Sequence, residues 1–393
     1  NDTITDVNLV RQLWLDNIYY GSIFSIHYNK NKTSIISGGN ISKYDGNHFG
    51  KIIYSDILNA IPDNYKWYDL DAAKSEVSFY GKWTEQINSK WQTYVDLQAR
   101  NIDYTINGFE SNPTLIVKNN YFFFNPKAGI SYINKGKKIY LSYSKAKKEP
   151  NRDDFETAVN ESPKPETLHD IELGIEKRNQ HSTWSVNGYF MYYNNQLVLT
   201  GEVNQVYAYT RKNIAKSYRA GIELEGFTTI NKWLSLSGNL TLSTNKALDF
   251  NEFIDQYDNN YDYLGQKKIV YNKTDLAFSP AVISSGEIAI HPIANTEIKL
   301  MGKYVGKQFM DNTSNKERAI KGYYTQDVRI DYSLTKKHKC NVNFFLQGNN
   351  LFSTKYVANG YTFSYYTDAN LTTENYYFPM ATFNIIGGIN VKL

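Results

Sequence analysis

The sequence has 393 residues and a formal net charge of +4, with 15% aromatic side chains and 34 tyrosines. A charge this small and dispersed excludes a nucleic-acid-binding protein, and the single cysteine, Cys340, excludes an internal disulfide framework or a cysteine metal cluster. The mean hydropathy is −0.54, and the absence of any run of about 18 apolar residues excludes a transmembrane helix. A transmembrane β-barrel remains open, because alternating strands carry only a weak hydropathy signal.

Seven short polar turns divide the chain, and each is flanked by about ten or more residues with alternating apolar positions, the length of a tilted membrane strand. The turns comprise residues 29–32, 87–90, 134–137, 178–182, 230–233, 291–296 and 336–339. Longer connections, such as 45–74 and 246–276, are rich in Asn, Asp, Tyr and Gly and are predicted to be loops. Short turns on a periplasmic side and long loops on an extracellular side are typical of outer-membrane barrels.

The final strand and residues 326–335 show strict alternation between an apolar and a polar face. Such alternation indicates a strand with lipid on one side and an aqueous lumen on the other. A soluble sandwich or propeller is the alternative, but a propeller needs more glycine and regular blades. We expect these residues to face lipid: Val328, Ile330, Tyr332, Phe344, Leu346, Ile385 and Ile389.

Seven hairpins and a lone terminal strand give about 15 strands, which is an odd number. The first and last strands then run in the same direction and cannot close an all-antiparallel ring. An isolated sheet would leave two unpaired edges in lipid, where unsatisfied backbone groups are very costly. The chain also begins at Asn1 without an initiator methionine or signal peptide. We therefore expect the C-terminal part of a larger barrel, separated from a second fragment by cleavage in an extracellular loop.

Several segments resemble the TonB-dependent receptors, in particular those of the Bacteroidetes type, and their order and spacing carry the resemblance. These segments are residues 14–30 with 44–50, 125–132, 140–155, 164–176, 213–226 and 344–360. The last strand matches as well, although it ends on Leu393 where an aromatic residue is common in the family. The resemblance implies an all-β fold in which residues 1–393 form one domain. That domain would be about 15 C-terminal strands of a transmembrane antiparallel β-barrel of about 22 strands, without the plug domain.

The resemblance also implies a function: TonB-dependent active transport of a nutrient across the outer membrane of a Gram-negative bacterium. The implied partners are an N-terminal plug-plus-barrel fragment of the same receptor, the TonB complex acting through that fragment, outer-membrane lipid, a surface lipoprotein and a small-molecule ligand. An iron–siderophore complex is the favoured ligand, with heme, cobalamin or another nutrient as alternatives. The heme receptors of the family carry FRAP and NPDL motifs, whereas the matching region here reads SKAKKEPNRDDF and ESPKPE. A passive porin and an adhesin are alternatives from other classes.

No catalytic constellation is evident, because Asp153 and Asp154 are adjacent carboxylates without an acid–base partner. We therefore expect no enzyme activity, no cofactor and no metal site, and His48 in an external loop cannot hold a metal alone. Aromatic side chains with a few charges suit an amphipathic ligand. The expected ligand contacts are Tyr207, Tyr209, Arg211, Tyr257, Tyr261, Tyr263, Tyr365 and Tyr366. The expected plug contacts on the lumen face are Glu172, Arg219, Glu223, Lys303, Arg329 and Asp331.

Overall fold

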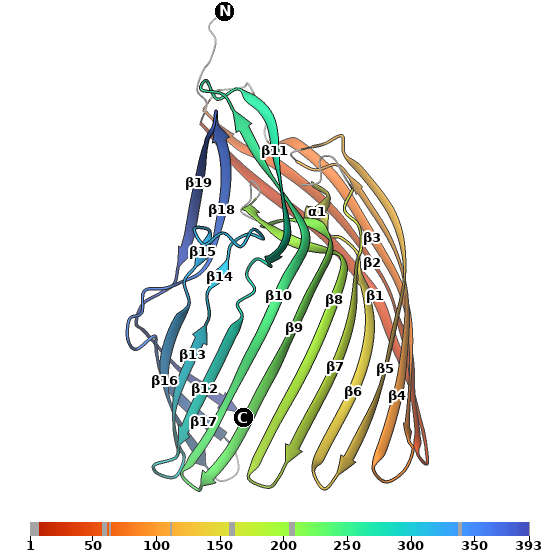
Figure 1. Ribbon diagram of the computed structural model, residues 1–393, viewed down its shortest axis with the longest axis vertical. Helices are drawn as coiled ribbons and strands as arrows, with labels where there is room; N and C mark the ends of the chain where they lie inside the picture. The colour runs from red at the N-terminus through yellow and green to blue at the C-terminus, as the bar shows by residue number, and fades with distance from the viewer. Residues whose placement is uncertain are drawn as a thin grey trace, which may run out of the picture. The chain divides into compact units, whose positions relative to one another are not determined.

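The computed structural model consists almost entirely of β-strands (Figure 1). It describes residues 8–56, 61–62, 64–110, 112–156, 162–203, 209–336 and 340–392. Among these residues the only α-helix is the five-residue α1, Arg152–Glu156. No described helix is long and apolar enough to cross a membrane.

The strands vary from two to 24 residues in length. Their bounds are β1 Leu9–Lys30, β2 Thr33–Ser55, β3 Tyr65–Gln86, β4 Trp91–Asn107, β5 Ile116–Asn134, β6 Lys137–Lys148, β7 Glu166–Arg178, β8 Ser182–Val203, β9 Tyr209–Asn231, β10 Leu234–Tyr257, β11 Tyr263–Asp275, β12 Val282–Ile290, β13 Thr296–Val305, β14 Gln308–Phe309, β15 Ala319–Ile320, β16 Tyr323–Lys336, β17 Cys340–Asn349, β18 Val357–Thr367, β19 Asn370–Pro379 and β20 Asn384–Lys392. Within the described residues, 18 strands belong to one sheet, and β14 and β15 form a separate pair. The all-β expectation is confirmed.

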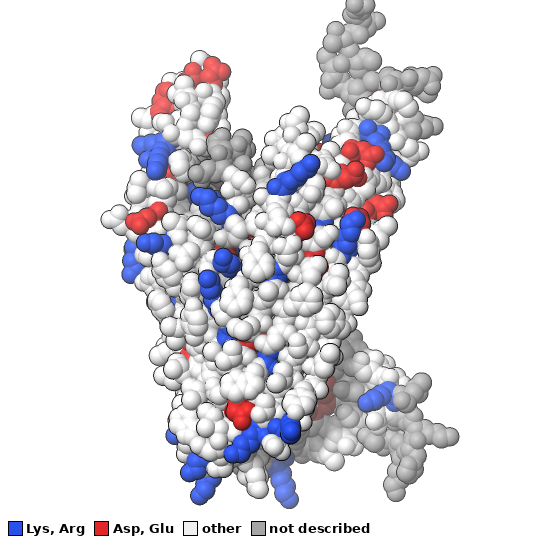
Figure 2. Space-filling view, turned by 90° about the vertical axis from the view of Figure 1, so that its right-hand side faces the viewer, with Lys and Arg blue, Asp and Glu red and all other residues white. Residues whose placement is uncertain are grey.

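The short turns occur where the sequence predicts them. At the first turn, Lys30 pairs with Thr33, and Asn31 adopts a left-handed φ of 52°. Gly136 has a φ of 73° in the third turn, which glycine tolerates without strain. The seventh turn, at 337–339, lies outside the described residues, although the backbones of Lys336 and Cys340 pair on either side of it. Figure 2 shows lysine and arginine side chains at the lower end of one face and, farther up, interspersed with acidic side chains.

The long connections 45–74 and 246–276 are mostly strand, so their prediction as loops is wrong. β2 and β3 remain paired as far as Ile52 and Tyr65, and β10 and β11 pair from Lys246 with Asp275 to Tyr257 with Tyr263. The physical reason is that a ladder of backbone hydrogen bonds continues wherever the partner strand continues. Within the 246–276 connection Phe250 and Ile254 are each 2% exposed, so the extended strands also bury apolar side chains.

The number of strands also differs from the expected value of about 15. Twenty strands are described, and five of them (β11, β14, β15, β18 and β19) lie within connections that the sequence presents as polar loops. Of the other strands, fourteen flank the seven short turns in pairs, and β20 follows the last connection. The difference therefore arises on the side of the long connections.

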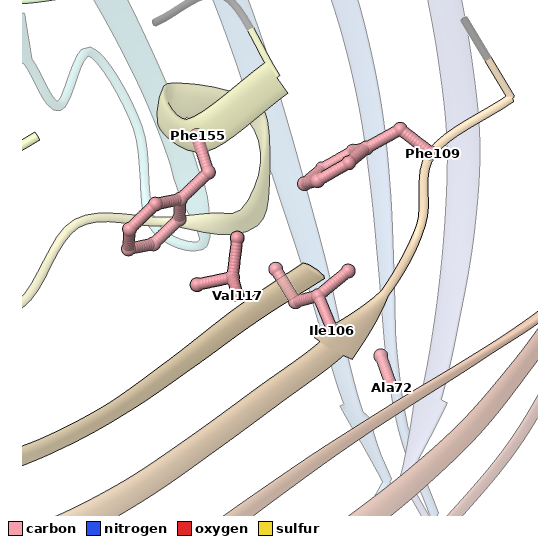
Figure 3. Packing of buried hydrophobic residues seen from close by; sticks show 5 residues of the cluster. All are labelled: Ala72, Ile106, Phe109, Val117 and Phe155. Atoms are coloured by element: carbon pink, nitrogen blue, oxygen red, sulfur yellow. The ribbon is translucent and has the colours of Figure 1, made fainter. Parts of the chain in front are cut away.

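The chain divides into two compact units. The first comprises residues 1–87, 93–128 and 145–165, and it is built on the ladders between β1, β2 and β3. Its buried cluster unites Ala72, Ile106, Phe109, Val117 and Phe155 (Figure 3). Phe155 belongs to α1, so this short helix packs against the strands through its aromatic side chain. Among described strands, β1 pairs only with β2.

The second unit comprises residues 88–92, 129–144 and 166–393. Nine of its strands pair in the order β7, β8, β9, β10, β12, β13, β16, β17 and β20, and each pair is antiparallel. A second buried cluster contains Val198, Ile214, Ala247, Phe250 and Leu276. Among described strands, β20 pairs only with β17.

The registers confirm the predicted division into two faces. Tyr332 pairs with Phe344, which pairs with Ile389. Arg329 pairs with Lys299 on one side and Gln347 on the other. The apolar face is exposed, with Ile385 at 61% and Ile389 at 62%. A sheet with one exposed apolar face and one charged face is what a membrane barrel wall requires.

Candidate functional site

The charged face of the second unit carries the residues that the sequence assigns to the lumen. Arg329 donates to both carboxylate oxygens of Asp331, from Nε at 2.7 Å and from Nη2 at 2.9 Å. The Arg219 guanidinium donates to Asn245 at 3.2 Å and to Ser279 at 2.9 Å. These side chains hold one another in place, so the face is a preorganised polar wall.

Glu172, Glu223 and Lys303 lie on the same wall. Glu172 pairs with Tyr189 of β8, whose other neighbour is Gly221. Glu223 and Lys303 are exposed. The registers therefore place all six predicted plug contacts on one face, and their contact with a plug stays a prediction.

Lys303 borders a shallow depression of about 400 Å³ in this wall. Its floor is a row of four glycines that lie opposite one another on β9, β10, β12 and β13, namely Gly226, Gly238, Gly286 and Gly302. Its rim includes the carboxylates of Glu225, Glu287 and Asp327. Phe227 and Met301 also line it, so the depression is a recess of mixed polar and apolar character on the charged face.

The second group of predicted residues, the ligand tyrosines, lies where two hairpins meet. The end of β10 runs parallel to β18, with Asp255 to Tyr257 pairing with Tyr365 to Thr367. The Asp368 amide donates to the Tyr257 carbonyl at 2.9 Å. We call this junction the clasp. Tyr257, Tyr263, Tyr365 and Tyr366 therefore lie on strands, so their prediction as loop residues is wrong, whereas Tyr261 lies in a hairpin turn.

The clasp brings together several of the predicted residues. The Tyr257 ring lies edge-on to Tyr263 at 5.7 Å and to Tyr365 at 6.3 Å between ring centroids. The Lys267 ammonium lies 4.3 Å from the centre of the Tyr366 ring. Tyr261, in the tip of the β10–β11 hairpin, is 68% exposed.

Three predicted ligand residues are not part of this cluster. Tyr207 lies outside the described residues, and for Tyr209 only the backbone, in β9, is described. Arg211 is a partly buried residue of β9 that pairs with Leu199 of β8.

Sequence reasoning missed a buried ion cluster that joins residues of β10 and β11 to Arg318 and Asp311. Arg318, which is 4% exposed, pairs with Asp311 at 2.7 Å and with Glu252 at 2.5 Å. The Tyr271 hydroxyl donates to Glu252 at 2.8 Å. Burial, followed by this hydrogen bond to Glu252, raises the pKa of Tyr271 and keeps it protonated. The cluster fixes the segment 306–322, which we call the inner segment, against β10 and β11.

The inner segment is also held by Asn312, which is fully buried. Its amide oxygen accepts from the Ala277 backbone at 2.9 Å, and its amide nitrogen donates to the Leu199 carbonyl. The run MDNTSNKER is so polar that it predicts an exposed loop. The available signal was the apolar residues that flank this run, Phe309 before it and Ala319 and Ile320 after it.

In the first unit, His48 lies in β2, between Leu15 of β1 and Leu70 of β3, and the prediction of a loop position is wrong. Its Nε2 is 3.4 Å from the Tyr44 hydroxyl. Burial lowers the pKa of His48, and the Arg152 charge lowers it further. A neutral, partly buried imidazole suits a structural role.

A network of charges joins β3, β4 and the residue after β6 in the first unit. Lys74 and Arg100 approach Glu149 at 2.6 and 3.6 Å, and Arg100 also pairs with Glu76 at 3.0 Å. Burial alone would raise the pKa of Glu149, but the hydrogen bond and charge of Lys74 hold it below the ordinary value. Among the residues described, no group of three or more His, Cys, Asp and Glu side chains could hold a metal.

Comparison with known proteins identifies the family. The family model for the TonB-dependent receptor-like β-barrel matches residues 2–351. The chain belongs to the TonB-dependent receptor β-barrel family. No curated protein matches it.

Solved receptors share this fold at low sequence identity. The copper transporter OprC has a TM-score of 0.71 at 12% identity, with 96% of this chain and 57% of that chain covered. The siderophore receptor PiuA from Acinetobacter baumannii has a TM-score of 0.70 at 15% identity, with coverages of 97% and 56%. The ferric citrate transporter FecA has a TM-score of 0.65 at 14% identity, with coverages of 97% and 55%. The chain thus spans little more than half the length of these receptors.

Proposed function

We propose that the chain is part of a TonB-dependent transporter in the outer membrane of a Gram-negative bacterium. The observation that carries the proposal is the family match over a sheet with one exposed apolar face and one charged face. The apolar face contacts lipid, because exposed Ile, Val and Tyr side chains gain free energy when they leave water. The charged face contacts a plug, because its ion pairs and amides offer many hydrogen bonds to a polar surface.

The proposed ligand is an iron–siderophore complex. The solved receptors with this fold include a siderophore receptor and a ferric citrate transporter, which supports an iron complex. A copper transporter shares the fold as well, so heme, cobalamin and other nutrients stay as alternatives. In this proposal the tyrosines at the clasp contact the ligand before it reaches the plug.

The proposed partners follow from the sheet edges. β1 and β20 each pair with a single described strand, and each leaves one edge for further strands. An edge in lipid is very costly, so the remaining strands and the plug of the same receptor complete the wall. The TonB complex acts through that plug, and a surface lipoprotein is a further proposed partner.

Uptake of a radiolabelled ferric chelate by cells that depend on this receptor tests the function. Transport should stop when TonB is deleted and return when TonB is restored. A passive porin would admit the solute at the same rate in both strains, which would rule out the transporter proposal.

A further inference from the structure

The hairpin of β18 and β19 combines many aromatic residues with an uncompensated negative charge. Residues 357–379 contain Asp368 and Glu374 and no lysine, arginine or histidine. Seven rings form a continuous series that begins on this hairpin and crosses the clasp to the next, and we call it the aromatic strip. In spatial order it comprises Phe378, Tyr361, Tyr376, Phe363, Tyr365, Tyr257 and Tyr263.

The geometry of the strip shows how its rings are presented. Tyr361 and Tyr376 stack at 4.8 Å with an interplanar angle of 7°, and Phe363 lies 6.0 Å from Tyr376. The inner rings therefore cover part of one another's faces. Tyr376 is nevertheless 42% exposed and Phe378 44% exposed, so ring surface remains open to solvent.

The opposite face of the same hairpin is buried at Gly360 and Thr362. Thr362 is 2% exposed, and a Cβ on Gly360 would lie 2.9 Å from the sulfur of Met310. The Gln308 side chain donates to the Ala358 carbonyl at 3.0 Å. The inner segment thus fixes the hairpin from behind, and the strip is a rigid surface that faces away from it.

Glu374 lies within the strip, opposite Phe363 in the ladder. Its two oxygens accept hydrogen bonds from Tyr365 at 3.3 Å and from Tyr376. Within the part of the chain that the structure describes, no lysine, arginine or histidine pairs with this carboxylate. Both tyrosine hydroxyls are donors to an anion, so the site is organised around a negative charge that lacks a counterion.

The chemistry of this arrangement selects one class of ligand group. An anionic group is repelled, and a neutral group leaves the carboxylate unused. A metal ion needs several ligands, and Glu374 stands alone. Ammonium and guanidinium groups form charge-assisted hydrogen bonds with a carboxylate and are attracted to aromatic faces.

We propose that the aromatic strip and Glu374 bind an organic cation, so that the transported ligand carries an ammonium or guanidinium group. This inference rests on the proposed function, because it names the chemistry of the ligand for which the clasp tyrosines are proposed. Glu374 provides the charge, Tyr365 and Tyr376 orient its oxygens, and the exposed rings of Tyr376 and Phe378 cover the cation.

Binding of two matched probes to the full receptor, purified in detergent with its plug, tests the inference. Benzylguanidinium and benzylurea have the same ring and nearly the same shape, and they differ in charge. Isothermal titration should show benzylguanidinium binding about tenfold more tightly. Equal affinities for the two probes would overturn the inference.

Two variants locate the effect. Glu374→Gln keeps the size of the side chain and should reduce benzylguanidinium affinity to that of benzylurea. Asp368→Asn removes the same charge from the turn of the same hairpin and should leave both affinities unchanged. Equal weakening by both variants would indicate a general charge effect and contradict the site.

A further variant tests the aromatic strip. Tyr376→Leu should weaken benzylguanidinium binding by about threefold or more, and unchanged binding would count against a role of the strip in binding the cation.

Uptake by cells separates this inference from the proposed function. Two ferric trihydroxamate chelates are compared, one with a free amine and one in which that amine is acetylated. TonB-dependent uptake of the amine form at a clearly higher rate supports both. TonB-dependent uptake at equal rates contradicts the cation inference alone. If neither chelate is taken up, the iron proposal fails while the probe pair still decides whether the cation site exists.

Discussion

At the scale of single residues, the structure separates side chains that hold the fold from side chains that meet solvent. His48 and Arg318 belong to the first group, since both are at least partly buried and contact neighbouring side chains. Tyr261 and Tyr263 belong to the second, with exposures of 68% and 60%. Ligand recognition is therefore expected from the second group.

The tyrosines of the β10–β11 hairpin should matter more for ligand affinity than His48. Replacing Tyr257, Tyr261 and Tyr263 together with Ala should weaken uptake of a ferric chelate about tenfold or more, because each lost aromatic contact contributes about 0.5–1.5 kcal/mol. His48→Ala should change uptake little, since a single imidazole cannot hold a metal. Labelled-ligand binding to cells measures both. Loss of binding in His48→Ala, with a normal triple variant, would favour heme.

Arg318 should be essential for the order of the inner segment. Arg318→Met leaves Asp311 and Glu252 as unpaired buried carboxylates, a change that costs about 3–5 kcal/mol. Hydrogen exchange of residues 308–320 should accelerate strongly in this variant. The exposed neighbour provides the control, because Lys316→Met should exchange like the unmodified receptor. Unchanged protection in Arg318→Met would show that the ion cluster does not hold the segment.

At the scale of elements, the pattern of side chains changes along the length of the strands. Next to the short turns they alternate between an apolar and a charged face, and farther out they continue as hairpins that carry both polar and aromatic side chains. The hairpins β10–β11 and β18–β19 are joined by a pairing of only three residues on each strand. The clasp is thus a small tertiary contact between two long local elements.

A charge on the apolar face should destabilise the sheet in a membrane. Ile330→Lys should cost roughly 2–4 kcal/mol, the cost of a lysine near the bilayer midplane. Ser333→Lys on the charged face of the same strand should cost much less. Urea titration of the receptor in lipid vesicles measures both. Labelling of a cysteine at position 329 by a lipid-soluble probe would show that the register is reversed.

The clasp should be trapped by a disulfide. Gln256 and Tyr366 are direct partners in the parallel pairing, so Gln256→Cys with Tyr366→Cys should oxidise spontaneously. Mass spectrometry of unreduced tryptic peptides detects the bond. Gln256→Cys combined with Leu371→Cys places the second thiol on β19 instead and should cross-link poorly. An absence of the 256–366 bond even with added oxidant would show that the hairpins do not meet as described.

At the scale of the whole molecule, the edges of β1 and β20 motivate the proposed partners. Among the described strands each of the two has a single partner, and further strands of a continuous wall are proposed for the other edge. The chain spans little more than half of the solved receptors. A working transporter is therefore expected to contain this chain together with a plug and the remaining strands.

The receptor isolated from its native membrane should contain that additional mass. Intact mass spectrometry and N-terminal sequencing of the purified complex should show a plug domain and about seven further strands, as expected for a barrel of about 22 strands. A complex of this chain alone in a closed barrel would refute the expectation. Denaturation before the measurement shows whether the parts are one polypeptide or two.

The sequence by itself determined the properties that repeat along a strand. Alternation has a period of two residues, so the faces of Ile330 and Arg329 could be assigned without knowing their neighbours, and short polar turns mark where a strand reverses. The family could be suggested for the same reason, since it rests on the order of such segments.

Only the tertiary structure decided how the polar connections fold. Lys267 and Tyr366, 99 positions apart, meet at the clasp, and Arg318 meets Glu252, 66 positions away. A polar residue has the same local pattern whether it is solvated or paired in the interior, and the partner that decides between these states is distant in the sequence.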